Sequence, residues 1–343
     1  MTTYRMFRFP VVLIVATLML AAAGCAAGGA APHQAGVEKP DLTVAIVPTT
    51  DCTGFFVALH DGLFAAQGLH IRYVPVASGE GSVNEQALGK FDVLCGSYVS
   101  DIEAQVNYDR GARATPAPNP SVSQIAANLD FFAAASVMQP NSVGLFTLPG
   151  APITSAADLR GKTVGINAPG NVAFLLLAEF LESNGLSPQS VRLKYFPFPV
   201  MTRMLVEHKI DVAFLAEPYI SIAEESAGVT ELTNLDRGPG EGYPMRGYTV
   251  TKQFADRYPG TLAAFKRALE QGQQIADADR HAAETAMEAF RATDGVTPAT
   301  AALLTFDYYP VGPVDGIAIQ RVADDMLQLG LLQRSFDVRQ MIG

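Results

Sequence analysis

The chain has no cluster of basic residues and no internal apolar stretch long enough to cross a membrane. Its 343 residues include 24 Lys and Arg against 34 Asp and Glu, a formal net charge of −10. We therefore expect no nucleic-acid partner, because such a partner needs a basic surface. Charged residues make up 17% of the chain and hydrophobic residues 49%. That composition argues against disorder and favours a folded chain with a large core.

Motifs of enzymes and metal sites are also missing. The five histidines have no metal-ligand spacing, and no Gly-x-Ser-x-Gly elbow occurs. The segment Gly161-Lys162-Thr163 lacks the glycine that a phosphate-binding loop needs at Ala156, and it precedes its strand instead of following it. The sequence therefore predicts no catalytic residue, no metal and no cofactor.

The first 25 residues have the pattern of an export signal. Arg5 and Arg8 precede a ten-residue apolar run at residues 11–20, which is shorter than the roughly 18 residues of a membrane-spanning helix. The sequence Ala22-Ala23-Gly24-Cys25 resembles the lipobox of bacterial lipoproteins, although that family usually has Leu at the position of Ala22. The resemblance implies cleavage before Cys25 and lipidation of its thiol. An ordinary secretory signal with an incidental cysteine is the alternative.

We therefore expect a lipoprotein signal peptide over residues 1–24 and a flexible tether, rich in Ala and Gly, over residues 25–40. The signal carries two of the 24 basic residues and none of the acidic ones, which leaves 22 basic against 34 acidic residues, a formal charge of −12. Several acyl chains on Cys25 would anchor the protein stably. The expected location is the extracytoplasmic face of the cell membrane.

From residue 41 onward, short β-branched runs alternate with helical patterns. Strands are predicted at residues 42–47, 71–76 and 92–95, with helices at 55–67 and around 83–88. A proline-punctuated stretch (114–120) and a strand (131–137) follow. The rhythm then restarts with a capped short helix at 154–159, strands at 163–166, 191–196 and 211–215, and helices at 172–184 and from 201. From residue 254 the pattern is mostly helical. This alternation predicts two α/β units.

The second unit is bracketed by two expected crossing strands, at residues 131–137 and 248–250. We therefore predict a first lobe over residues 41–138 and 245–343, and a second lobe inserted at 139–244. Two lobes joined by two crossings form a clamp that closes over a ligand.

Six segments resemble the extracytoplasmic solute-binding proteins of ABC importers. They are Gly54-Phe55-Phe56, Asp61-Gly62-Leu63-Phe64, Gly68-Leu69, residues 153–165, Lys209-Ile210-Asp211-Val212-Ala213 and Glu217-Pro218-Tyr219. The likeness runs from about residue 41 to about residue 290 and is greatest to the group that binds sulfonates, taurine, nitrate or thiamine pyrimidine precursors. It implies a periplasmic-binding-protein type II fold, with mixed, mostly parallel sheets flanked by helices. It also implies a small-molecule solute and an ABC permease as partners; we expect a monomer.

Ligands of open α/β sheets bind at the carboxyl ends of the strands, and five segments of this chain stand there. The candidate ligand-binding residues are Thr50, Asp51, Cys52, Thr53, Ser78, Gly79, Ser97, Tyr98, Asn167, Gly170, Asn171, Glu217 and Tyr219. Each also has a structural interpretation. The Thr, Ser and Asn side chains are common helix caps, the glycines permit tight turns, and the tyrosines can be packing residues.

Charge is the best guide to the ligand. None of the five segments contains Lys or Arg, but they contain Asp51, Glu80 and Glu217. A carboxylate such as Glu217 can accept hydrogen bonds from an exocyclic amine while Tyr98 or Tyr219 stacks on the ring. We therefore slightly favour a thiamine pyrimidine precursor or a similar amine-bearing heterocycle over a sulfonate, taurine or nitrate. A ligand sensor is a further alternative, and so is a pyrimidine-synthesising enzyme, whose cysteine-rich iron motif is here reduced to a lone Cys52.

Apart from Cys25, the cysteines are Cys52 and Cys95. Both lie at the carboxyl ends of strands of the first lobe that are neighbours in the strand order usual for the resembled fold. The resemblance thus implies a disulfide between them in an exported protein. Two buried free thiols are the alternative.

Overall fold

The computed structural model describes residues 36–115, 124–291 and 294–343. The predicted signal peptide, Cys25, the tether up to residue 35 and residues 116–120 of the proline-punctuated stretch lie outside these residues. Within them, no helix is both long enough and apolar enough to cross a bilayer.

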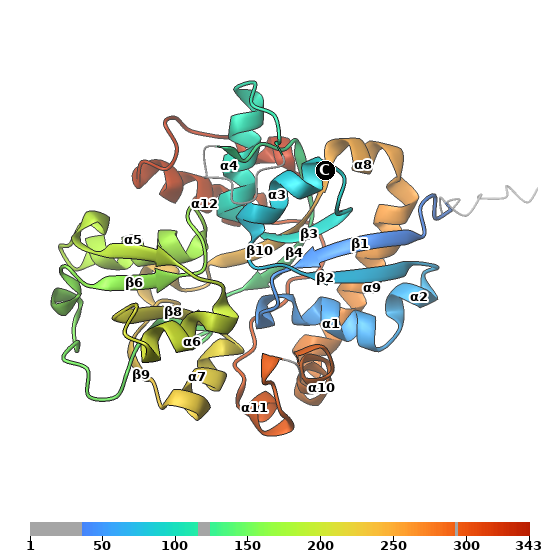
Figure 1. The fold of residues 1–343 in the computed structure, drawn as a ribbon. Coiled ribbons are helices and arrows are strands. Elements are labelled where there is room, and N and C mark those ends of the chain that lie inside the picture. Colours follow the sequence, from blue (N-terminus) through green and yellow to red (C-terminus); the bar gives the residue numbers. More distant parts are fainter. Residues whose placement is uncertain (1–35, 116–123, 292–293) are drawn as a thin grey trace, which may run out of the picture. The chain divides into compact units, whose positions relative to one another are not determined.

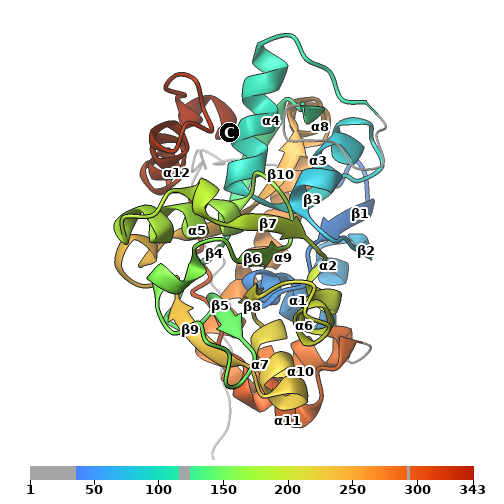
Figure 2. The ribbon, with the colours of Figure 1, turned by 60° about the vertical axis from the view of Figure 1, so that its left-hand side comes forward.

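Two mixed sheets, each of five strands in the described residues, carry the fold (Figures 1 and 2). The first has the order β2-β1-β3-β10-β4 and the second β7-β6-β8-β5-β9. In both, three neighbouring strands run parallel and the fourth pairs antiparallel to its two neighbours. We call each sheet, with the helices that pack on it, the first and the second lobe. The predicted two-lobed α/β fold is confirmed.

The strands are β1 (Asp41–Ile46), β2 (His70–Pro75), β3 (Val93–Ser97), β4 (Leu129–Val137), β5 (Val143–Thr147), β6 (Thr163–Ile166), β7 (Arg192–Tyr195), β8 (Val212–Ala216), β9 (Thr230–Asn234) and β10 (Pro244–Thr251). The chain changes sheets twice, between β4 and β5 and again between β9 and β10. Strands β5 and β9 were not predicted. β9 is a polar edge strand whose residues are half-buried or exposed, so it has no apolar alternation.

The α-helices are α1 (Thr53–His60), α2 (Leu63–Ala66), α3 (Gly79–Ala87), α4 (Tyr98–Asp109), α5 (Val172–Ser183), α6 (Phe198–Val206), α7 (Tyr219–Ala227), α8 (Lys252–Arg257), α9 (Pro259–Ala278), α10 (Arg280–Arg291), α11 (Pro298–Leu303) and α12 (Gly316–Gln328). Short 3₁₀ helices lie at Thr50–Cys52, Ala156–Leu159, Pro188–Ser190, Gly238–Gly240 and Val338–Met341. The single helix predicted at 55–67 is wrong in one respect: Gly62, with φ +70°, separates α1 from α2. The predicted capping box of Ser155 and Asp158 is present.

Both faces of the first sheet are covered, and β1 shows how its sequence does this. Val44 and Ile46 point to the apolar cluster that contains Phe55 and Phe265, from α1 and α9. Ala45, between them, belongs to the cluster on the other face with residues of α4 and α12. Alternate residues of a strand point to opposite faces, so a strand that is apolar throughout fits a sheet covered on both sides.

Helices α1 and α9 approach each other very closely, through glycines on both sides. A Cβ atom added to Gly272 would overlap the carbonyl oxygen of Gly54 and lie 2.7 Å from the Cβ of Ala58. Both helices would have to separate to admit even a methyl group, because backbone atoms cannot move aside as a flexible side chain can.

We predict that Gly272→Ala lowers the free energy of unfolding by about 2 kcal/mol through this overpacking. The matched control is Gly81→Ala in α3, where the new Cβ would lie 3.6 Å from the Ser78 hydroxyl, an ordinary contact. That variant should lose nothing, since Ala favours a helix more than Gly does. Urea denaturation measures both; equal stabilities of the two variants would contradict the close α1–α9 contact.

Candidate ligand-binding site

Two neighbouring chambers lie where strand ends of the two lobes meet, and Phe198 lines both. The outer chamber has a volume of about 460 Å³. Its lining residues are Val47, Pro48, Tyr73, Pro75, Val76, Ala77, Pro197, Phe198, Pro199, Tyr219, Phe290, Arg291 and Asp294. The inner cavity is only about 10 Å³, the space of one water molecule. It is lined by Gly79, Glu80, Ser97, Asn167, Asn171, Val172, Ala173, Phe198, Phe214, Ala216, Met245 and Arg246.

Flat rings form much of the outer chamber's wall. Phe198 and Tyr219 stack on each other, with ring centroids 5.4 Å apart and planes 15° apart. Phe290 stacks on the buried Phe56, at 5.5 Å between centroids. A chamber of this volume with aromatic walls suits an organic ligand with a flat body.

One buried guanidinium also lines the outer chamber. Arg291, at the end of α10, is 3% exposed. Its Nη2 donates to the Tyr219 hydroxyl at 2.7 Å, and it forms an ion pair with Asp294. Its Nε has no partner with normal hydrogen-bonding geometry among the described residues, and neither has the Tyr73 hydroxyl, which lines the same chamber. Burial raises the pKa of Tyr73, and Arg291 partly offsets this effect, so the two side chains lie close together. A buried donor without a partner is costly, so the Arg291 Nε offers a hydrogen bond to a ligand acceptor.

The inner cavity contains a carboxyl group that is buried and unpartnered. Glu80, in the first turn of α3, is 3% exposed, and neither side-chain oxygen has a partner with normal hydrogen-bonding geometry. Burial raises the pKa of Glu80 to about 7, because it disfavours the charged form more than the nearby Arg246 restores it.

Arg246 lines the inner cavity, but its guanidinium group already forms an ion pair with an aspartate. On β10 it pairs across the sheet with Ser97, and its Nε forms an ion pair with the buried Asp51. The Thr49 hydroxyl donates to the same Asp51 oxygen at 2.8 Å. This charge is therefore largely compensated before any ligand arrives.

Further buried acids surround the Asp51–Arg246 pair. Burial and the neighbouring Glu80 raise the pKa of Asp101 well above its usual range, and burial and Asp51 do the same for Asp307. Several carboxyl groups therefore surround the single guanidinium group of Arg246. Because burial favours the uncharged form of these groups, the surroundings suit a ligand that exchanges hydrogen bonds with a carboxyl group.

Five of the predicted residues line the two chambers. Gly79, Ser97, Asn167 and Asn171 line the inner cavity, and Tyr219 lines the outer chamber. The Asn171 side chain donates to Asn167 Oδ1 at 2.7 Å and accepts from the Phe174 amide at 3.2 Å, which caps α5. Asn171 thus both caps α5 and lines the inner cavity.

The other predicted residues lie near the chambers but do not line them. Ser78 caps α3, and Thr53 donates to the Thr50 carbonyl oxygen at 2.7 Å. Tyr98 packs in the core against Phe131, with ring centroids 5.0 Å apart, so it is not placed to stack on a ligand. Gly170 has φ +61° and serves the turn.

Glu217 has its partners inside the protein. Its carboxylate accepts from the Ser221 amide at 3.2 Å, from the Ser221 hydroxyl at 2.9 Å and from the Thr305 amide at 3.4 Å. Both Glu217 oxygens thus have partners, whereas the carboxyl group of Glu80, which lines the inner cavity, has none with normal geometry. The site also contains cations, which the five segments lack, because Arg246 and Arg291 reach it from elsewhere in the chain.

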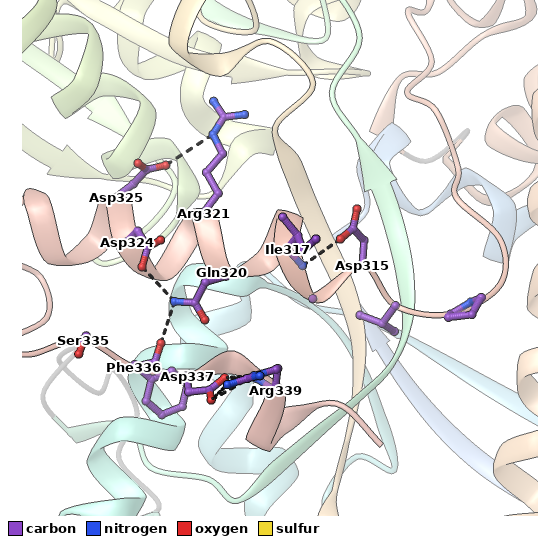
Figure 3. Close-up of a pocket in the computed structure, with 13 residues that line it drawn as sticks. Asp315, Ile317, Gln320, Arg321, Asp324, Asp325, Ser335, Phe336, Asp337 and Arg339 are labelled. Carbon is purple, nitrogen blue, oxygen red and sulfur yellow. Dashed lines mark hydrogen bonds and ion pairs between the residues drawn. The ribbon is translucent and has the colours of Figure 1, made fainter.

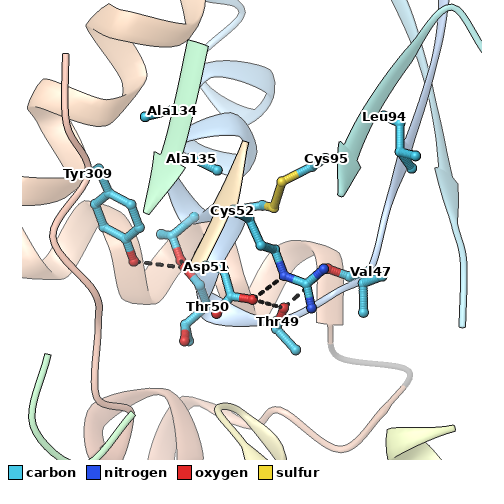
Figure 4. Close-up of a disulfide and its surroundings, with 12 residues drawn as sticks. Val47, Thr49, Thr50, Asp51, Cys52, Leu94, Cys95, Ala134, Ala135 and Tyr309 are labelled. Carbon is cyan, nitrogen blue, oxygen red and sulfur yellow. Dashed lines mark hydrogen bonds and ion pairs between the residues drawn. A yellow bond between two sulfur atoms is a disulfide. The ribbon is translucent and has the colours of Figure 1, made fainter. Parts of the chain in front are cut away.

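Cys52 and Cys95 are joined by a disulfide, which Figure 4 shows beside Asp51. It ties the segment after β1 to the middle of β3, and both cysteines are buried. The same segment reaches the other lobe, since the Thr50 amide donates to the Glu217 carbonyl oxygen at 3.0 Å. A second bond between lobes runs from the Val172 amide to the Ser97 hydroxyl at 3.3 Å.

The sequence reasoning missed the residues that give the site its character: Arg246, Arg291, Phe198, Tyr73 and Phe290. Arg246 lies two residues before the strand predicted at 248–250, so an earlier strand start would have placed it opposite Ser97. Phe198 lies in Phe196-Pro197-Phe198-Pro199 directly after β7, a position where an aromatic residue reaches the carboxyl edge of the sheet. Arg291 ends a helix far along the chain, and no sequence signal links it to Tyr219.

A cavity of about 1,220 Å³, larger than either chamber, is a groove along α12 (Figure 3). Its lining comes from residues 313–325 and 335–339, none of which follows a strand. We therefore take the interlobe chambers as the candidate site. Among the described residues, no group of three or more His, Cys, Asp or Glu is placed to hold a metal ion.

Known proteins resemble this chain in sequence and in fold. A model of the NMT1-like family matches residues 35–289. The nitrate import ATP-binding protein NrtC of Synechocystis sp. is 26% identical over 265 residues, which are 73% of this chain but only 37% of that protein. The chain thus spans about a third of the length of this curated relative.

Two solved structures share the fold. One is the alkanesulfonate-binding protein SsuA from Xanthomonas axonopodis pv. citri bound to MOPS, with a TM-score of 0.71, 18% identity, and coverage of 90% of this chain and 99% of that one. The other is the periplasmic nitrate-binding protein NrtA from Synechocystis PCC 6803, with a TM-score of 0.71, 14% identity, and coverage of 89% and 85%. At these identities the likeness concerns the fold.

The buried Glu80 makes a prediction for stability against pH. Its pKa is about 7 in the folded protein and 4.5 for the ordinary group, so the folded state holds more protons than the unfolded state between these values. Stability should therefore fall as the pH rises from about 4.5 to about 7. Glu80→Gln removes the charge, and the variant should be more stable than the wild type at pH 8, by up to about 3 kcal/mol, but not at pH 4.5.

The control is Glu85→Gln in the same helix, since Glu85 pairs with Lys90 at the surface. Urea denaturation at pH 4.5, 6 and 8 measures the three proteins. A Glu80→Gln effect that is the same at every pH would show that burial does not hold this carboxyl group protonated.

Proposed function

The chain belongs to the NMT1-like family, and from this membership we propose that it is the substrate-binding component of an ABC importer. It captures a small solute between its two lobes and delivers it to a membrane permease. The observation that carries the proposal is that both chambers are lined by strand ends of both lobes. A ligand there touches both lobes at once, so it stabilises the closed arrangement over an open one.

We propose an amine-bearing heterocycle, such as a thiamine pyrimidine precursor, as the solute. The open carboxyl of Glu80 supports an amine, and the stacked Phe198 and Tyr219 support a flat ring. The free Nε of Arg291 supports an acceptor atom, such as a ring nitrogen. An amine-bearing heterocycle combines all three features in one small molecule.

A sulfonate, taurine or nitrate is the second candidate, and a specific observation favours it. The two buried arginines, Arg246 and Arg291, are the kind of donor that binds oxyanions. The known relatives named for nitrate and alkanesulfonates point the same way. Against it, both guanidinium groups are already paired with aspartates, and nitrate would leave most of the 460 Å³ outer chamber unfilled.

A role in binding, not catalysis, is part of the proposal. Cys52 is held in a disulfide, so it has no thiolate to offer as a nucleophile or metal ligand. A sensor that passes ligand closure to a membrane kinase would have the same chambers. We place the protein outside the cytoplasm, tethered through Cys25, which accords with the export pattern of residues 1–25.

A thermal-shift screen of the full chain tests the proposal. The panel contains aminopyrimidines, thiamine and its fragments, taurine, alkanesulfonates, nitrate and bicarbonate. A ligand at 1,000 times its dissociation constant adds about 4 kcal/mol of stability, which raises the melting temperature by several degrees. We expect an aminopyrimidine to give the largest shift. A shift with oxyanions alone would replace the heterocycle by the second candidate, and no shift with any compound would contradict a small-solute site of these classes.

Two matched variants then locate the amine. Glu80→Gln should weaken aminopyrimidine binding about tenfold or more, because it removes a charge-assisted hydrogen bond. Glu217→Gln should have the smaller effect on affinity, since the Glu217 carboxylate binds Ser221 and Thr305. Isothermal titration calorimetry measures the affinity of both variants. A larger loss of affinity in Glu217→Gln than in Glu80→Gln would show that Glu217, and not Glu80, binds the amine.

A further inference from the structure

The contact between Arg291 and Tyr219 joins the two lobes at the wall of the outer chamber. Arg291 belongs to α10, which packs on α1 and α9 of the first lobe. Tyr219 begins α7 of the second lobe, directly after β8. The hydrogen bond between them, 2.7 Å long, is buried and connects segments 72 residues apart.

Opening the lobes must break this bond together with the others that cross the boundary. The Thr300 hydroxyl of α11 donates to Glu225 of α7 at 2.7 Å, farther along the same edge. Unlike the residues of those other contacts, Arg291 also lines the outer chamber, and its Nε has no partner with normal hydrogen-bonding geometry. One guanidinium therefore touches the other lobe, the aspartate beside it and the space a ligand would fill.

We infer that Arg291 couples occupancy of the outer chamber to closure of the lobes. This inference rests on the proposed function. A ligand acceptor atom at Nε completes the hydrogen bonding of the guanidinium and fixes its plane. The fixed plane holds Nη2 in line with the Tyr219 hydroxyl, because the nitrogens of a guanidinium form one rigid fork. The ligand thereby strengthens a bond between lobes without touching that hydroxyl itself.

Arg291 is thus both a ligand contact and a positioning residue for Tyr219. The role of the Tyr219 ring is separate. The ring packs on Phe198 in the second lobe, whereas only its hydroxyl reaches the first lobe. Tyr219→Phe consequently removes the bond between lobes and leaves the stacked wall in place.

Hydrogen exchange on the full chain, without ligand, tests the bond between lobes directly. The amides of Thr50 and Val172 donate across the lobe boundary, so their exchange rates report opening. We expect Tyr219→Phe to speed both about tenfold. Amides of the β1–β3 ladder, at Ala45 and Leu94, should exchange at the wild-type rate. The control, Tyr195→Phe, changes a tyrosine that is 48% exposed and lines neither chamber.

Two results of this comparison would overturn the inference. One is wild-type exchange at Thr50 and Val172 in Tyr219→Phe. The other is equal acceleration of the β1–β3 ladder, which would show a loss of overall stability and no specific effect on lobe opening.

The ligand half of the inference is tested with 4-aminopyrimidine, and with taurine as a second probe. Either probe, if bound, should slow exchange at Thr50 in the wild type. Arg291→Lys keeps the charge but lacks both Nε and Nη2, so its exchange with ligand is compared with its own ligand-free rate. The variant should raise the dissociation constant about tenfold and show no slowing by the ligand. Slowing that persists in Arg291→Lys would exclude Arg291 as the coupling residue. If neither probe slows exchange in the wild type, the proposed ligand classes are wrong. The comparison of wild type with Tyr219→Phe without ligand still shows whether the Arg291–Tyr219 bond holds the lobes together.

Discussion

The buried ion pair between Asp51 and Arg246 is the interaction on which the site depends. Asp51 follows the first strand of the first lobe, and Arg246 lies on β10, where the chain returns from the second lobe. Neither charge could stay buried alone, because breaking such a pair leaves an uncompensated charge in the protein interior. The pair therefore holds the segment after β1 against the returning strand, and the disulfide of Cys52 holds the same segment against β3.

This pair also decides the electrostatics of the chambers. It uses the charge of Arg246, so Glu80 has no full cationic partner and keeps its proton more tightly than an exposed glutamate does. The inner cavity is then small and lined by a buried carboxyl group, whereas the outer chamber is broad and aromatic. The difference between the two spaces suits the proposed ligand in one orientation, with its donor group toward the inner cavity and its flat body in the outer chamber.

Much of the fold could be predicted from the sequence, because the strands that carry it are short, apolar and bounded by turns. β6 has the predicted limits, and β1, β3 and β8 differ by a residue or two. The edge strand β9 could not be found, since it is polar and its half-buried and exposed residues show no apolar alternation. The site was predictable only where local signals exist. Asn171 caps a helix after a strand and was found in this way, but Arg246 and Arg291 enter the site through tertiary packing.

The two crossings of the chain also set an order for folding. The second sheet is built from a continuous stretch, β5 to β9, whereas the first needs β10 to join β3 to β4. As the chain emerges from its N-terminus, the second sheet has all its strands while the first is still split into β1–β3 and an unpaired β4. Until residue 251 is made, the edges of β3 and β4 lack their shared neighbour, and unpaired edges of this kind invite wrong partners. The inserted lobe is thus the part that can reach its final structure first, and the lobe that begins the chain is the last to be completed.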